Sequence, residues 1–88
     1  MIKIAKAVPA GTQHVRLEFS DGTHGVFDFS DILKKDSSLT RPLRSEVEFS
    51  RFFLELGALC WPNGLEFSAH YLRQELEKAG RLQRKDVA

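Results

Sequence analysis

The side chains best suited to chemistry in this sequence are two histidines and two carboxylates: His14, Glu18, His24 and Asp28. All four stand at even positions of two alternating segments, so we expect them on one face of a β-hairpin. Imidazole nitrogens and carboxylate oxygens can bind a metal ion or exchange protons. The register derived below pairs His14 with Asp28 and Glu18 with His24, which separates the two histidines. They are then too far apart to share a metal at about 2.1 Å each, and cross-strand charge pairing is the simpler interpretation.

The only cysteine, Cys60, offers no stronger candidate. One cysteine excludes an internal disulfide and a multi-cysteine zinc site. Strand alternation places Cys60 opposite Glu66, and a facing carboxylate raises the pKa of a thiol and makes it less reactive. The sequence also has no Gly-rich phosphate loop, no Ser-x-x-Lys and no His-Glu-x-x-His motif. We therefore expect no cofactor, no metal and no enzymatic activity.

The composition indicates one small globular domain. The chain has 88 residues, of which 42% are apolar and 28% are charged, values typical of a folded soluble protein. No apolar run is long enough to cross a bilayer, and the first residues lack the apolar core of a signal peptide. We therefore expect a cytoplasmic protein that does not bind membranes.

Charge is distributed unevenly along the chain. Residues 1–77 carry nine basic and eleven acidic side chains, a formal −2, and residues 78–88 carry four basic side chains against one acidic, a formal +3. The four basic residues are Lys78, Arg81, Arg84 and Lys85. We expect a single domain over residues 1–80 and a basic tail over 81–88. Such a tail indicates nucleic-acid contact as one function, although many charged tails only keep a protein in solution.

The alternating segments 14–19 and 23–29 predict a β-hairpin whose register follows from its loop. A three-residue loop, Ser20-Asp21-Gly22, makes a type I turn with a G1 bulge and a left-handed glycine. This loop sets Leu17 opposite Gly25 and Val15 opposite Phe27, with the large apolar side chains on one face. A slip of one residue would expose two phenylalanines. Leu17 and Phe27 are therefore expected to face the core, and Arg16 and Val26 to face outward.

The remaining patterns predict an α+β fold. Strands are expected over 2–8, 53–56 and 58–61, and a second bulged turn over 62–64 sets Trp61 opposite Leu65. Helices are expected over 31–35 with Ser30 as N-cap, from a Ser-x-x-Glu capping box at 45–48, and over 69–79 with Ser68 as N-cap. The predicted architecture is a small antiparallel sheet of five to six short strands built from β-hairpins, with two to three helices including a C-terminal helix.

Three ordered stretches resemble a known family. They are residues 19–22 with 26–33, residues 42–44 with Phe49, and the motif Trp-Pro-Asn-Gly-Leu-Glu-Phe at 61–67 with Tyr71 and Leu72. Together they resemble the small bacterial family named Domain of Unknown Function 2442, over roughly residues 1–72. The resemblance implies an α+β domain without an established activity. Some relatives are encoded beside a second small protein, as in toxin–antitoxin pairs, which implies a small partner protein.

The C-terminal helix carries an apolar stripe of Ala69, Leu72, Leu76 and Ala79. Leu72 is expected in the core of the chain itself. We expect Leu76 and Ala79, with Arg73 and Arg81 beside them, to pack on another chain, either a second copy or a small partner protein. The alternative is that the whole stripe docks on the domain's own sheet.

Three functions follow from these patterns. The first is a protein-interaction module of antitoxin-like or regulatory type. The alternative is a nucleic-acid-binding accessory protein that uses the basic tail. The third is a small enzyme or ligand-binding protein that uses the histidine-bearing face.

Overall fold

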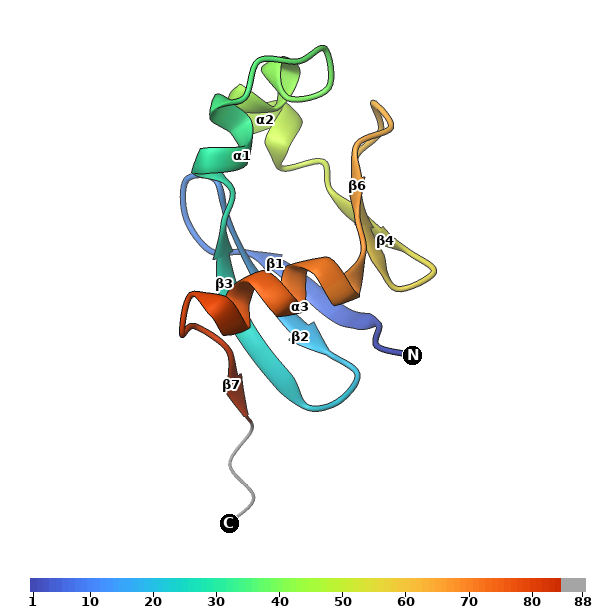
Figure 1. The fold of residues 1–88 in the computed structure, drawn as a ribbon. Helices are drawn as coiled ribbons and strands as arrows, with labels where there is room; N and C mark the ends of the chain where they lie inside the picture. The colour runs from blue at the N-terminus through green and yellow to red at the C-terminus, as the bar shows by residue number, and fades with distance from the viewer. Residues whose placement is uncertain (85–88) are drawn as a thin grey trace.

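The computed structural model describes residues 1–84 and has the expected α+β fold (Figure 1). In chain order its elements are β1 (Ile4–Pro9), β2 (His14–Phe19), β3 (Thr23–Asp28), α1 (Ser30–Lys34), the 3₁₀ helix η1 (Arg41–Arg44), α2 (Glu46–Phe49), β4 (Phe53–Glu55), β5 (Ala58–Cys60), β6 (Glu66–Phe67), α3 (Ala69–Lys78) and β7 (Gln83–Arg84). The strands form two antiparallel sheets, β1-β2-β3-β7 and β4-β5-β6, where a single sheet was expected. α3 lies across one face of the larger sheet (Figure 1).

The β2–β3 hairpin has the predicted register. Val15 pairs with Phe27 and Leu17 with Gly25. The turn is closed by the Gly22 N–H, which donates to the Phe19 carbonyl over 3.1 Å, and Gly22 has a φ of 86°. This left-handed conformation favours glycine because it has no Cβ. The alternating pattern therefore buries Val15 and Leu17, each 0% exposed.

The smaller sheet repeats the same turn chemistry. The Trp61 N–H donates to the Leu65 carbonyl over 2.9 Å, and Gly64 has a φ of 98°, as the bulged turn requires. The two sheets meet where the Ile4 N–H donates to the Gly57 carbonyl over 2.9 Å. This contact brings the β4–β5 hairpin against β1.

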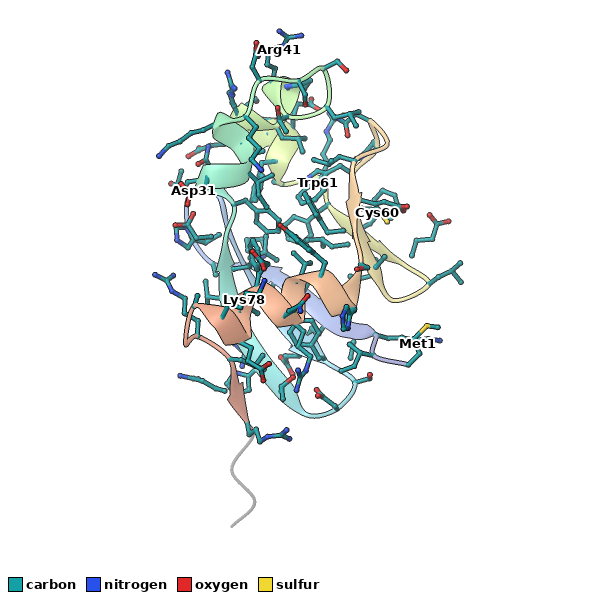
Figure 2. All side chains as sticks on the ribbon, in the orientation of Figure 1. Met1, Asp31, Arg41, Cys60, Trp61 and Lys78 are labelled. Carbon is teal, nitrogen blue, oxygen red and sulfur yellow. The ribbon has the colours of Figure 1, made fainter. Side chains whose placement is uncertain are left out.

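Aromatic side chains fill the space between the sheets and the helices. Trp61 is 2% exposed and points into the centre of the molecule, whereas Cys60 lies on the opposite side of the smaller sheet (Figure 2). The ring centroids of Phe29 and Trp61 are 5.6 Å apart at 81°, an edge-to-face contact. The Trp61 Nε1–H donates to the Phe49 carbonyl over 2.8 Å, so the buried polar atom of the indole is satisfied. Trp61 is therefore a core residue.

α3 begins and ends as its sequence predicts. The Ser68 hydroxyl accepts a hydrogen bond from the Tyr71 N–H over 3.1 Å, as an N-cap does. At the other end Gly80 has a φ of 69°, and the Arg81 N–H donates to the Leu76 carbonyl over 2.9 Å. This is a Schellman ending, which reverses the direction of the chain.

The reversal after α3 corrects the expected boundary of the tail. Gln83 and Arg84 form β7 and pair with His24 and Thr23 at the outer edge of β3. Residues 81–84 are therefore part of the folded domain, and Lys85 lies outside the described residues.

Two of the expected helix caps are wrong. α1 includes Ser30 itself, with Phe29 at the N-cap position, and the Asp28 carboxylate two residues earlier accepts from the Ser30 N–H over 2.9 Å. α2 has Ser45 at its N-cap position but no side-chain cap bond. The Ser45 N–H donates to the carbonyl of Pro42 and Glu48 pairs with Arg51, so the donor and acceptor of the Ser45–Glu48 bond of a capping box are engaged elsewhere. No helix within residues 1–84 is long and apolar enough to cross a membrane.

Candidate functional site

A groove bordered by α1, β3 and α3 lies on the surface of the described residues. Its volume is about 280 Å³. Apolar side chains, among them Phe27, Ile32 and Leu76, lie along it. The charged residues that line it are Asp28, Asp31, Glu75 and Arg81. An apolar floor with a charged rim is the arrangement found in protein interfaces.

One face of α3 forms a wall of this groove. Tyr71, Glu75 and Ala79 line the groove and are spaced four residues apart, so they project from the same side of the helix. Tyr71 is 40% exposed, and its ring stacks on Phe67 with centroids 5.9 Å apart at 20°. This contact packs the ring of Tyr71 on Phe67 at the groove and leaves much of the tyrosine exposed.

The rim of the groove has an acidic balance. Among the lining residues three carboxylates face one guanidinium, a formal −2, and Lys34 and Lys78 outside the lining pair with Asp31 and Glu75. The backbone hydrogen bond from Ser30 is the largest of several causes that lower the pKa of Asp28, and the charge of Arg81 acts in the same direction. Asp28 is therefore ionised at neutral pH. Asp31 on α1 lies at the outside of the molecule (Figure 2) and pairs only at the surface, with Lys34 at 3.7 Å.

The structure corrects the expectation that Leu76 faces another chain. Leu76 is 2% exposed and packs on β3. A Cβ atom added to Gly25 would lie 3.2 Å from the Leu76 Cδ1 and 2.7 Å from the Arg81 carbonyl oxygen. The glycine thus lets α3 approach the sheet closely, so the sheet continues beneath Leu76. Ala79 is exposed and, with Arg81, lines the groove.

Arg73, the fourth residue expected at a partner interface, lies outside the groove and bonds to the β2–β3 turn. Its Nε–H donates to the Asp21 carboxylate over 3.0 Å, and its Nη1 lies 3.9 Å from Glu77. The other oxygen of Asp21 accepts from the N–H and hydroxyl of Thr23. Asp21 therefore links the turn to α3.

The contacts of Asp21 predict that the free energy of unfolding depends on pH. The pKa of Asp21 is lowered from its ordinary value of 3.8, first by the Thr23 hydroxyl and also by Arg73. A lowered folded-state pKa contributes stability above pH 3.8, and this contribution is lost as the pH falls through the lowered value. The free energy of unfolding, measured by urea denaturation, is expected to fall less between about pH 5 and pH 2 in Asp21→Asn than in the unaltered chain. An unchanged pH slope would contradict the assignment.

The basic residues expected to bind nucleic acid each make a different contact within the described part of the chain. Lys78 lies 3.4 Å from Glu75, Arg81 lines the acidic groove, and Arg84 belongs to β7. Lys85 lies outside the described residues. Nucleic-acid binding through this set stays a prediction.

The four residues of the hairpin's outer face pair as their register predicts. His14 is opposite Asp28, with Nε2 and Oδ2 3.6 Å apart, and Glu18 is opposite His24. Glu18 also accepts a hydrogen bond from Arg16. Within residues 1–84, no three side chains of His, Cys, Asp or Glu gather as a metal ion requires.

Cys60 is opposite Glu66, as predicted, with Sγ 3.7 Å from the Glu66 carboxylate. Burial, followed by the charge of Glu66, raises the pKa of the Cys60 thiol. The Cys60 side chain is 5% exposed.

The sequence identified Leu76, Ala79 and Arg81, and it identified Asp28 for a different role, but it missed Asp31 and Glu75 in the same groove. The four-residue spacing of Tyr71, Glu75 and Ala79 indicates that they share one face of the helix. The positions of Asp28 and Asp31 against that face depend on how α1 and α3 pack around β3. Local patterns carry no information on that packing.

The fold is that of a small α+β domain of two antiparallel sheets, with a groove between α1, β3 and α3. A family model described as "Protein of unknown function (DUF2442)" matches residues 4–77, and the chain belongs to this family. The match extends past Leu72, where the resemblance was expected to end, and includes nearly all of α3. No curated protein and no solved structure matches the chain significantly.

Proposed function

We propose that this chain is a protein-interaction module that binds a small partner protein through the groove between α1, β3 and α3. The observation that carries the proposal is the combination of an apolar floor, an exposed and stacked Tyr71, and an acidic rim. Tyrosine is enriched at protein interfaces, where it adds large contact area with little loss of conformational entropy.

The size of the groove supports a protein partner over a small molecule. At about 280 Å³ the groove lies just below the range of about 300–1,000 Å³ usual for small-molecule sites. A few side chains of another protein fit such a volume. The role is one of binding and not of catalysis, and an antitoxin-like or regulatory activity would consist of occupying the partner's functional surface.

The test is co-purification of the full chain from its native cells, followed by reconstitution with the recombinant partner. Glu75→Lys reverses a charge at the groove, and Glu77→Lys makes the same change on the same helix outside the groove. We expect Glu75→Lys to raise the dissociation constant about tenfold or more, which corresponds to a loss of about 1.4 kcal/mol or more in binding free energy. Glu77→Lys should bind as the unaltered chain does.

Two results would contradict the proposal. One is equal binding by both variants, which would place the interface elsewhere. The other is a chain that captures no protein and runs as a monomer by light scattering. A dimer that Glu75→Lys dissociates would identify the partner as a second copy of the chain.

A further inference from the structure

The outer edge of β3 is only partly covered by another strand. Within residues 1–84, β7 pairs with Thr23 and His24 alone, and no strand pairs with that edge from Gly25 to Asp28. The Arg81 carbonyl lies close to Gly25, so the part of the edge open to a further strand is Val26 to Asp28. These residues also line the groove.

The hydrogen bonds of the hairpin show which backbone groups point to this edge. The Phe29 N–H donates to the Gln13 carbonyl over 2.8 Å, on the side of β2. In an antiparallel strand the N–H and C=O of one residue point to the same edge, and successive residues alternate. Phe27 therefore bonds toward β2, and Val26 and Asp28 present their backbone groups to the open edge.

We infer that the partner binds by adding an extended, basic segment as a strand along Val26–Asp28 of β3. The inference rests on the proposed function and specifies its geometry. Exposed edges of this kind pair readily with a strand from another chain. The backbone of such a segment would bond to Val26 and Asp28.

The surroundings of the edge define the chemistry of that segment. Side chains of an added strand alternate between the two faces of the sheet. Those on the face of Phe27 would enter the groove and lie against Tyr71 and Leu76, which favours apolar groups. Those on the other face would lie beside Asp28, which favours lysine or arginine as a cross-strand neighbour. Asp31 and Glu75 at the rim pair with Lys34 and Lys78 at exposed positions, so they add less to this preference than Asp28 does.

The test uses the full chain and a synthetic peptide, acetyl-Lys-Val-Lys-Val-Lys-amide, followed by amide hydrogen exchange in NMR spectra. With the peptide at ten times its dissociation constant, exchange at Val26 and Asp28 should slow about tenfold, because only free protein exchanges. The peptide with Glu in place of Lys should not bind, nor should one with N-methylated backbone amides. No binding at about 1 mM peptide, or protection at β1 and not at β3, would overturn the inference.

The substitution Val26→Pro tests the same edge by changing the protein instead of the peptide. Proline removes an N–H that points away from β2, so the ladder with β2 is retained. The Val26→Pro variant should fold but no longer bind the peptide, whereas Val26→Thr, which keeps the N–H, should bind it. Equal binding by Val26→Pro would overturn strand addition. If Val26→Pro does not fold, exchange in the unaltered chain and the N-methylated peptide decide the question.

The two proposals fail in different ways. If Glu75→Lys abolishes binding of the native partner while Val26→Pro leaves it unchanged, the groove is the interface but strand addition is wrong. If neither variant changes binding of the partner, the proposed function itself fails.

Discussion

Trp61→Ala is expected to lower the free energy of unfolding by about 3–5 kcal/mol, the usual cost of removing a buried aromatic side chain. Trp61 is 2% exposed, and four phenylalanine rings have their centroids within 6.3 Å of its own: Phe29, Phe49, Phe52 and Phe67. A domain of 88 residues has a total stability of about 4–13 kcal/mol. At the lower end of this range the variant is unfolded at 25 °C, and at the upper end it stays folded with a much lower urea midpoint.

Two control variants separate the causes of this loss. Trp61→Phe keeps an aromatic ring but removes the Nε1–H that donates to Phe49, so it should cost less, about 1–3 kcal/mol. Phe53→Ala removes an aromatic side chain that is 43% exposed, and its cost should be small. Urea denaturation of the three variants gives the comparison. If Trp61→Ala costs no more than Phe53→Ala, the core is not organised around Trp61.

Leu76→Glu is expected to unfold the chain as a monomer. Leu76 is 2% exposed and packs over Gly25, so the substitution buries a carboxylate without a partner and removes apolar contacts. We expect a loss of at least about 3 kcal/mol in the free energy of unfolding. The sequence alone predicts the opposite, a folded chain that no longer associates.

Ala79→Glu is the matched control on the same stripe of α3. Ala79 is exposed and lines the groove, so the variant should stay within about 0.5 kcal/mol of the unaltered stability. Circular dichroism and thermal melting distinguish the two variants. A folded Leu76→Glu variant with an unchanged melting temperature would contradict the position of Leu76 in the core.

The acidic groove gives Ala79→Glu a second use. The added carboxylate would not unfold the chain, yet it would fill part of the groove where a partner side chain is proposed to lie. A variant that keeps its stability but loses partner binding would separate the interface from the core on one helix.

The sequence by itself determined the features that depend on neighbouring residues. Strand alternation and the turn at Gly22 defined the register of β2 and β3, since a slip of one residue would move every large apolar side chain to the wrong face. Ser68 and Gly80 defined the ends of α3 for a similar reason, because helix ends need local groups to satisfy free backbone N–H and C=O groups. These interactions span only a few residues.

The tertiary structure decided the features that join distant segments. Gly25 and Leu76 pack together although about fifty positions separate them, and this contact placed Leu76 in the core. The short β7 strand returned to the β3 edge only because the end of α3 reversed the chain beside it. The acidic groove arises where α1, β3 and α3 meet. Side-chain periodicity specifies which face of an element is apolar, but the neighbour that covers this face depends on the packing of the whole chain.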